Sequence, residues 1–252
     1  LNRGGTTVED WKFDEIASQA GVDDPFYSFP CWFFDYDNDG WQDLFVSGYN
    51  LDRLSLLAYD AANEYLGKKP LAATPKIFHN NKNNTFSDVS AALGFENRVC
   101  YTMGSNFGDL DNDGWLDFYL GTGSPDYRSI VPNRMFRNDS GTFFSEVTYG
   151  GGFGHIQKGH AVDFGDIDND GDQDILLQIG GAVEGDVFRN VLFQNPGNKN
   201  KWINLELHGT TCNKAAIGAR IKISVTTIKG KARDIYVTCG TGGSFGSSSL
   251  QQ

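Results

Sequence analysis

Cations, cysteine motifs and long apolar runs are all scarce in this sequence, and each shortage excludes a class of protein. The chain has 21 Lys and Arg against 32 Asp and Glu, which gives a formal net charge of −11. Because binding to nucleic acid or to an anionic membrane needs clustered cations, neither partner is expected. No apolar run reaches the roughly 18–20 residues that cross a bilayer, so no membrane span is expected either.

The common catalytic and metal-binding motifs are also missing. The four cysteines form no C-x-x-C pair, so a zinc or redox motif has no support. The sequence contains no G-x-S-x-G, no H-E-x-x-H and no phosphate-binding P-loop. The first residue is Leu1, and no charged-then-apolar signal segment precedes the globular pattern, so we expect a mature or truncated chain.

Aromatic residues, glycine and acidic residues are abundant by contrast. Aromatics make up 13% of the chain and hydrophobic residues 39%, which is enough to form a core. The 31 Gly beside only 7 Pro indicate many tight turns. Thirteen of the 32 acidic residues lie in three nine-residue segments, 35–43, 109–117 and 166–174, which align without gaps. Each segment follows apolar or aromatic residues and precedes an apolar run that ends in Gly.

A second motif repeats at constant spacing from these segments. Phe13, Phe86 and Phe144 precede the first Asp of the next acidic segment by 22, 23 and 22 residues. Three further segments predict a strand that enters a hairpin turn: 76–80, 134–138 and 191–195. One unit thus contains four short strands in about 60 residues, as a propeller blade does. We therefore predict an all-β fold of propeller-type blades.

The first unit is longer than the second. Its surplus lies at about 51–75, where Leu54, Leu57, Ala58, Ala61 and Tyr65 have a helix-like spacing. The spacing predicts a helical insertion on a blade edge.

The acidic segments themselves predict calcium loops. Four carboxylates within nine residues repel one another by about 1 kcal/mol per pair in water and about 4 kcal/mol at an effective dielectric constant of 20, so packing them together needs a cation. Asp at positions 1, 3, 5 and 9 supplies hard oxygens, Gly at position 6 allows a sharp reversal, and position 7 offers a backbone carbonyl, a set that suits Ca²⁺. The predicted ligands for about three ions are the carboxylates of Asp35, Asp37, Asp39, Asp43, Asp109, Asp111, Asp113, Asp117, Asp166, Asp168, Asp170 and Asp174, and the carbonyls of Trp41, Trp115 and Asp172. The side chain of Asp172 is expected to be solvated.

An EF-hand begins with the same spacing but needs a Glu at position 12 and a helix after the loop. Position 12 is Val46, Leu120 or Leu177 in the three segments. The EF-hand is therefore excluded, and the loops are expected to join strands.

These loops resemble the FG-GAP or VCBS-type repeat, the calcium-loop blade of integrin α-subunit propellers and of many secreted bacterial proteins. The downstream sequence resembles the ASPIC/UnbV module, which follows such repeats in cartilage acidic protein and its bacterial relatives. The residues that carry this second resemblance are Gly159-His160-Ala161, Gly180-Gly181-Ala182, 192–197, Trp202, 213–220 and 242–246. The resemblance implies a propeller-repeat region at 1–195 and a small C-terminal β module at 196–252.

Residues 202–207, 221–225 and 235–239 alternate apolar and polar side chains, which predicts half-buried strands in that module. Cys212 and Cys239 lie in it and could close a disulfide loop, which would leave Cys31 and Cys100 to each other. Free buried thiols are the equal alternative.

Propellers of the resembled family usually have about seven blades, whereas this chain shows three acidic loops. Three blades cannot close a ring. Three explanations stay open: degenerate strands fill the gap, the chain is a piece of a longer one, or other subunits cover the missing edges by self-assembly.

The resemblance implies an extracellular, secreted or cell-surface module for adhesion, matrix or filament assembly through protein or glycan contacts. Millimolar extracellular Ca²⁺ would fill loops of modest affinity. The sequons at Asn83 and Asn138 fall on hairpin turns that we expect to be equivalent, and they suit glycosylation. The alternative is a calcium-containing propeller enzyme of the polysaccharide lyase or dehydratase type. Its only support is His155 and His160 beside the third loop, with His160 as the catalytic residue.

Overall fold

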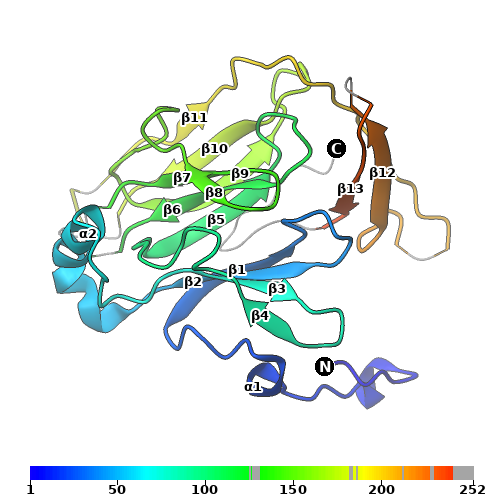
Figure 1. Cartoon of the computed structure of the whole chain (residues 1–252), viewed down its shortest axis with the longest axis horizontal. Helices are drawn as coiled ribbons and strands as arrows, with labels where there is room; N and C mark the ends of the chain where they lie inside the picture. Colours follow the sequence, from blue (N-terminus) through cyan, green and yellow to red (C-terminus); the bar gives the residue numbers. More distant parts are fainter. Residues whose placement is uncertain are drawn as a thin grey trace.

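The protein is built almost entirely of antiparallel strands (Figure 1). The computed structural model describes residues 1–124, 126, 131–181, 184–185, 187–211, 213–227 and 230–240, without the side chains of residues 51 and 54. Three sheets follow one another along the chain, and a separate two-stranded hairpin follows them. The predicted all-β fold class is confirmed.

Each of the three sheets is a simple meander whose strands pair in chain order. The first sheet contains β1 (Ser28–Phe34), β2 (Asp43–Gly48), β3 (Lys76–Asn80) and β4 (Phe86–Asp88). The second contains β5 (Thr102–Gly108), β6 (Asp117–Thr122), β7 (Arg134–Asn138) and β8 (Phe144–Glu146). The third contains β9 (Gly159–Gly165), β10 (Asp174–Ile179) and β11 (Val191–Phe193) within the described residues. The hairpin is β12 (Arg220–Thr226) and β13 (Ala232–Thr238).

Each sheet begins one strand before its acidic loop, and the Phe motif forms the last strand of the first two sheets. Phe86 starts β4 and Phe144 starts β8, so both belong to the sheet of the preceding acidic loop. Phe13, the first copy of the motif, makes only an isolated bridge to Asn2 and stays two-thirds exposed. The sequence repeat was therefore correct in spacing, but the structural unit starts at a different strand.

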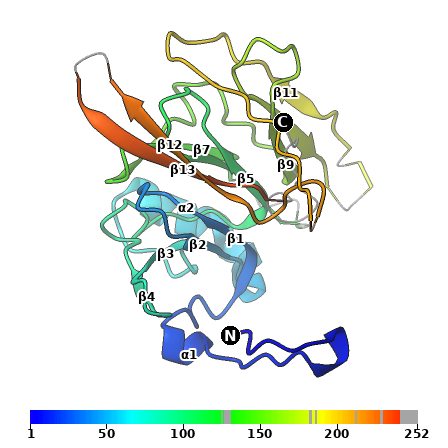
Figure 2. The same cartoon turned by 90° about the vertical axis from the view of Figure 1, so that its right-hand side faces the viewer.

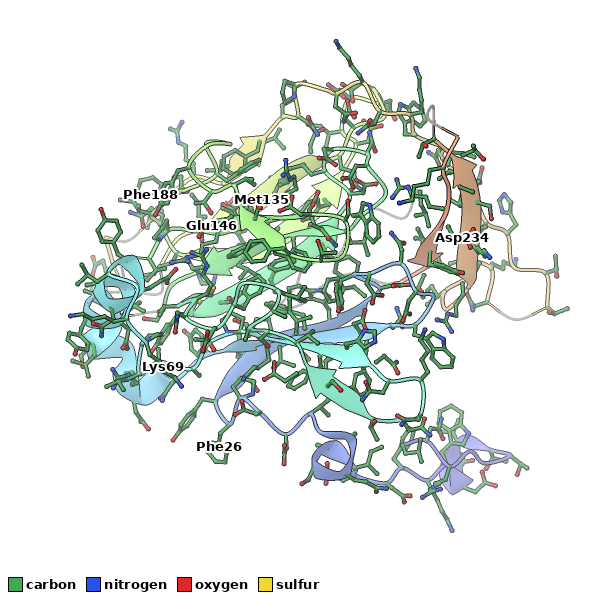
Figure 3. The ribbon with its side chains drawn as sticks, in the orientation of Figure 1. Phe26, Lys69, Met135, Glu146, Phe188 and Asp234 are labelled. Carbon is green, nitrogen blue, oxygen red and sulfur yellow. The ribbon has the colours of Figure 1, made fainter. Side chains whose placement is uncertain are left out.

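The second sheet is buried on both faces because it lies between the other two. Phe118 and Tyr119 are adjacent in β6, so their side chains point to opposite faces of the sheet. The Phe118 ring packs against Trp32 and Phe45 of the first sheet, with ring centroids 5.9 and 5.2 Å away. Tyr119 packs on the other face, in a cluster with Val162, Phe164, Ile175 and Leu177 of the third sheet. Figure 3 shows Met135 among the strands of this stack.

The predicted insertion at 51–75 is helical. It forms a 3-10 helix, η2 (Leu51–Leu56), followed by α2 (Leu57–Tyr65). Two other short helical turns, η1 (Val8–Asp10) and α1 (Ala17–Ala20), lie in the N-terminal segment, below the first sheet in Figure 1. Along the described part of the chain, none of the helices has the length and apolar character that crossing a membrane requires.

A buried ion-pair network ties α2 to the second sheet. Glu64 accepts two hydrogen bonds from the Arg134 guanidinium, at 2.6 and 2.9 Å, and a third from the backbone N–H of Val99 at 2.8 Å. Arg98 bridges Glu64 to Glu146, with its Nη1 2.7 Å from a Glu146 oxygen. The Arg134 side chain is only 7% exposed, so its charge depends on these two carboxylates.

We expect Glu64→Gln to lower the free energy of unfolding by about 3 kcal/mol, because it leaves the buried Arg134 charge with Glu146 alone, 3.6 Å away. Asp88→Asn is the matched control, since the Lys76–Asp88 pair is more exposed and is expected to contribute less than about 1 kcal/mol. Urea denaturation of both variants checks the difference. If both variants lose the same free energy of unfolding, the buried network contributes no more to stability than the exposed ion pair.

One predicted strand is absent. Residues 202–207 form no strand and have no ladder partner in the described structure, and Trp202 and Ile203 are both more than half exposed. The other two predicted strands form the β12–β13 hairpin, which crosses the ends of the sheets in Figure 2. Asp234 marks this hairpin in Figure 3.

Candidate metal centres

Each acidic segment is the loop that joins the first two strands of its sheet. We name them the first loop (35–43), the second loop (109–117) and the third loop (166–174). The fourth residue of each loop is an Asn with a left-handed backbone, at φ of 53°, 53° and 58°. The Gly at position 6 also has positive φ, between 84° and 93°. Two left-handed residues within three positions give the tight reversal that was predicted from Gly alone.

The first carboxylate of each loop holds the loop backbone together. One oxygen of Asp35, Asp109 and Asp166 accepts the N–H of the residue at position 5, at 3.1, 3.0 and 3.1 Å. The other oxygen accepts the N–H of the Gly at position 6, at 2.8, 2.7 and 2.8 Å. The three loops are therefore built in the same way.

The ninth carboxylate joins each loop to the third strand of its sheet. Asp43, Asp117 and Asp174 are buried, at 0–2% exposure. One oxygen of each accepts an N–H from loop position 2, at 3.0–3.2 Å. The other accepts the N–H of the Asn that ends or follows the third strand, at 2.8 Å in every sheet. The backbone donors fix where these carboxylates point.

The carboxylates then converge. Positions 1, 3 and 9 of the second loop bring ligand oxygens within 4.8 Å of one another, and so do positions 1, 3 and 9 of the third loop. In the first loop two such groups form, Asp35 with Asp37 and Asp39, and Asp37 with Asp43 and His79. Asp113 and Asp170, at position 5, lie outside these groups, and one oxygen of each accepts the N–H of position 7. Whether the carbonyls of Trp41, Trp115 and Asp172 also ligate stays a prediction.

His79 is a site residue that the sequence analysis missed. Its Nδ1 lies 3.3 Å from an Asp37 oxygen and 3.4 Å from an Asp43 oxygen. The equivalent residues in the other sheets are Arg137 and Gln194, and Gln194 donates to the position-3 carboxylate of Asp168 at 2.7 Å. A usable signal was present, because each of these residues directly precedes the repeated Asn at the end of the third strand.

Burial makes the charged form of these carboxyls costly. It is the main cause that raises the pKa of Asp35 to about 6, of Asp109 to about 7 and of Asp43 to about 8. Repulsion from neighbouring loop carboxylates adds to the rise, and burial raises the pKa of Asp117 well above its usual range. The buried Asp111 Oδ1 has no hydrogen-bond partner in the described structure. Such converging, under-compensated oxygens could hold a metal ion.

Side-chain amides connect each loop to the next. Asn38 of the first loop donates to the Gly114 carbonyl of the second at 2.7 Å, and Asn112 donates to the Gly171 carbonyl of the third at 3.1 Å. Asn112 also donates to the Asp172 carboxylate, at 2.5 Å. The expectation of a solvated Asp172 side chain is therefore wrong: it is buried between loops, where Asn198 bonds to it as well.

The C-terminal part of the chain, within residues 198–236, contacts all three loops. The sequence analysis did not predict these contacts. The guanidinium groups of Arg220 and Arg233 donate to the carbonyls of Gly40 and Asp113. They also lie 5.8 and 5.6 Å from the ring centroids of Trp41 and Trp115, respectively, a cation–π geometry.

Further contacts of the C-terminal part reach side-chain and backbone atoms of the loops. The backbone N–H of Tyr236 donates to Asn38 Oδ1 at 2.9 Å, and Asn200 donates to the Asp111 carbonyl at 2.8 Å. Trp202 lies so close to Gly171 that a Cβ there would fall 1.9 Å from the indole. The third loop therefore requires Gly at this position.

The two predicted glycosylation sites differ in the structure. Asn83 is exposed in the β3–β4 turn. Asn138 is buried at the end of β7, equivalent to Asn80, and its Nδ2 donates to the carbonyls of Tyr36 and Leu116 at 2.8 and 3.2 Å. The two hairpin turns are equivalent as expected, since Asn80 pairs with Phe86 as Asn138 pairs with Phe144. The two sequons are not equivalent, because Asn138 forms a joint between sheets that a glycan on Nδ2 would disrupt.

We expect Asn138→Ala to lower the free energy of unfolding by about 2 kcal/mol, because two buried carbonyls lose their donor. Asn83→Ala, which removes the other sequon, is the matched control and is expected to change stability by less than about 0.5 kcal/mol. Chemical denaturation measures both. If Asn138→Ala leaves the free energy of unfolding unchanged, the hydrogen bonds of this joint contribute little to stability.

Of the two alternatives left open, the described cysteines follow the free-thiol one and do not form a Cys31–Cys100 pair. Cys31 is exposed on β1, whereas Cys100 is fully buried in the core between the first two sheets, and both are free thiols. Burial raises the pKa of the Cys100 thiol to about 12, so it stays protonated. Cys239 is also a free thiol, and its predicted partner Cys212 lies outside the described residues.

His160, the alternative catalytic residue, lies in β9 with its Nε2 2.6 Å from the Gly180 carbonyl oxygen. His155 has its Nδ1 3.1 Å from the backbone nitrogen of Gln157, and its ring packs edge-on against Phe188. Both imidazoles thus have structural partners beside the third sheet.

Comparison with protein families agrees with this geometry. A model described as the FG-GAP-like repeat matches residues 35–120 and 109–177, a stretch that contains the three loops and more than half of the chain. The match does not extend to residues 196–252, so their resemblance to the ASPIC/UnbV module stays a prediction. No curated protein sequence matches the chain. Repeats of this kind suggest propeller-like binding modules and are typical of extracellular proteins. On the strength of the repeated loops and this match, the chain belongs to the FG-GAP-like repeat family.

Proposed function

We propose that this chain is a calcium-stabilised extracellular module that binds and assembles through protein or glycan contacts. The observation that carries the proposal is that all three acidic loops bring carboxylates together. Each loop brings three or more acidic side chains within 4.8 Å, and backbone N–H groups fix their directions. Structural turns without a cation would have no need to bring buried charges together three times.

The donor set favours Ca²⁺ over other common cations. The second and third loops offer only oxygen ligands, from carboxylates and backbone, which suits a hard cation with many ligands. Mg²⁺ keeps more water and takes fewer protein carboxylates, whereas Zn²⁺ prefers His and Cys. The first loop differs through His79, which makes it the site where a nitrogen ligand is available.

An extracellular location follows from the same chemistry. Loops of modest affinity fill at millimolar calcium but stay empty at cytosolic concentrations. The repeat family is typical of extracellular proteins, which supports this inference. The exposed Asn83 sequon suits such a location too.

A binding role fits the described residues better than catalysis does. The acidic side chains are already engaged by the loops, and the Nε2 of His160 lies 2.6 Å from the Gly180 carbonyl oxygen, a structural partner. Because a paired-carboxylate hydrolase needs two carboxyls free to exchange protons with the substrate, the loops do not supply that pair.

Isothermal titration of the metal-free protein tests the proposal. We expect about three equivalents of Ca²⁺ to bind because each loop brings three carboxylates together, and Mg²⁺ to bind more weakly because it takes fewer protein carboxylates. Asp88→Asn is a suitable control, since this carboxylate pairs with Lys76 outside the three loops and its removal should leave the stoichiometry unchanged. The absence of calcium binding, or a preference for Mg²⁺, would overturn the proposal.

A further inference from the structure

The joints between neighbouring sheets repeat in detail. At the first joint, position 2 of the first loop, Tyr36, enters the second sheet: its ring lies 6.3 Å from that of Phe144, and its carbonyl accepts a hydrogen bond from Asn138 at 2.8 Å. At the second joint, position 2 of the second loop, Leu110, packs into the core of the third sheet, and its carbonyl accepts from Asn195 at 2.8 Å. Position 2 of a loop is thus an apolar plug, and the next sheet provides a socket.

The first sheet has the same socket, without a plug. A cleft of about 390 Å³ is lined by Phe33, Trp41, Gln42, Asn80, Phe86 and Arg220. Strand register makes the first five equivalent to Phe107, Trp115, Leu116, Asn138 and Phe144. At the first joint, Phe107, Leu116 and Phe144 pack in the same cluster as the plug Tyr36, and Asn138 bonds to its carbonyl.

The polar half of this socket is incomplete as well. Asn138 and Asn195 each donate to two carbonyls, one in their own sheet and one on the plug. Asn80 donates to the Gln42 carbonyl at 2.8 Å, and the described residues provide no second acceptor for its amide. Phe33 and Trp41 are 55% and 42% exposed. The socket therefore has an unused donor beside an exposed aromatic wall.

The third loop has the complementary feature, a plug without a socket. Its position 2 is Ile167, which is 50% exposed. No described residue donates to the Ile167 carbonyl as Asn138 does to that of Tyr36. Asp166 and Asp168 neighbour Ile167 in the sequence, but their carboxylates belong to the converging group of the third loop, so the tip offers a partner its apolar side chain and its carbonyl.

We propose that the Ile167 tip of one copy of this chain inserts into the Phe33–Trp41–Phe86 socket of a second copy, so that copies associate head to tail. The interface continues the joint that the chain already forms twice, with Ile167 in the place of Tyr36 and Leu110. At the existing joints, a loop Asn donates to the Gly carbonyl of the next loop. In the first loop, Arg220 already donates to that carbonyl, of Gly40. The contact between copies therefore uses only the apolar plug and the Asn80 amide. Because the two surfaces differ, the contact is heterologous and can repeat along a chain of subunits.

This inference deepens the proposed function by naming the partner, and it rests on that proposal because the plug is the tip of a calcium loop. Sedimentation velocity of the full chain in Ca²⁺, over a wide concentration range, tests it. We expect wild type to form dimers and larger species, and Ile167→Ser or Phe33→Ser each to weaken association about 30-fold or more. Ile156→Ser is the matched control, because Ile156 is 61% exposed away from both features and should not matter.

Mixing the two variants gives the sharpest result. Ile167→Ser keeps an intact socket and Phe33→Ser keeps an intact plug, so an equimolar mixture should form one-to-one dimers and nothing larger. A monomeric wild type overturns the inference, and so does association that neither variant weakens or a mixture that stays monomeric.

Calcium titration of the same samples separates this failure from that of the proposed function. If about three Ca²⁺ ions bind and no association occurs, only the head-to-tail inference fails. If no calcium binds while the variants still abolish association and the mixture still dimerises, the calcium proposal fails and the joint stands. Normal melting temperatures for both variants show that their loss of association is not a loss of folding.

Discussion

Removal of calcium with EGTA is expected to lower the melting temperature by roughly 20 °C. A ligand at a hundred times its dissociation constant stabilises the folded state by about 2.7 kcal/mol per site, so three sites contribute about 8 kcal/mol. That is comparable with the whole stability of a typical domain. For a chain of this size, 1 kcal/mol corresponds to about 2–4 °C. Differential scanning fluorimetry with and without EGTA measures the shift.

The contacts between loops explain why the effect should spread beyond the sites. The loops hold the joints through Asn38 and Asn112, and the C-terminal hairpin contacts the Asp113 carbonyl through Arg233 and the Asn38 side-chain oxygen through the Tyr236 N–H. Buried carboxylates without a cation repel one another, so the loops should open and release the hairpin before the sheets separate.

Hydrogen exchange checks this order. In EGTA the amides of β12 and β13 should lose protection first, while β6, which is buried along its whole length, should lose it last. Mg²⁺ at the same ionic strength is the control, because it should restore little of the protection. An unchanged melting temperature in EGTA would show that the loops are stable without a metal.

The sequence predicted what depends on short separations along the chain. The four acidic positions and the Gly at position 6 lie within nine residues, so their spacing alone specified the loop. The position-9 carboxylates were found for the same reason. Their partners were not, because Asn138 lies 21 residues from Asp117, and only the pairing of β6 with β7 brings the two together.

The errors have the same physical origin. His79 lies 36 residues from Asp43, beyond the helical insertion, so no local spacing could place it in the first site. Residues 202–207 alternate as a strand does, but a strand also needs a partner for its backbone, and the described structure provides none. The Asn138 sequon was recognised from local sequence alone. In the folded chain its amide is hydrogen-bonded to the Tyr36 carbonyl at the joint between two sheets.

Asp117→Asn is expected to remove one calcium ion and to lower the free energy of unfolding in Ca²⁺ by about 4–5 kcal/mol. Loss of one ion at a hundred times its dissociation constant costs about 2.7 kcal/mol. The rest comes from the hydrogen bonds, since a buried bond to a charged group is worth about 1.5–3 kcal/mol. The Asn oxygen can still accept from Asn138 N–H, but the amide NH₂ then faces the N–H of Leu110, where two donors meet.

The cost should depend on calcium, which separates a ligand from a structural carboxylate. In EGTA the buried Asp117 charge lacks a cation and burial raises its pKa well above the usual range, so a neutral Asn replaces a group that is already unfavourable as an anion. The stability difference between Asp117→Asn and wild type should therefore shrink by about 2.7 kcal/mol in EGTA. Asp88→Asn, whose carboxylate pairs with Lys76 outside the loops, should show no such dependence. An equal cost for Asp117→Asn with and without calcium would mean that this carboxylate only holds the loop to β7, and that the second loop binds no ion through it.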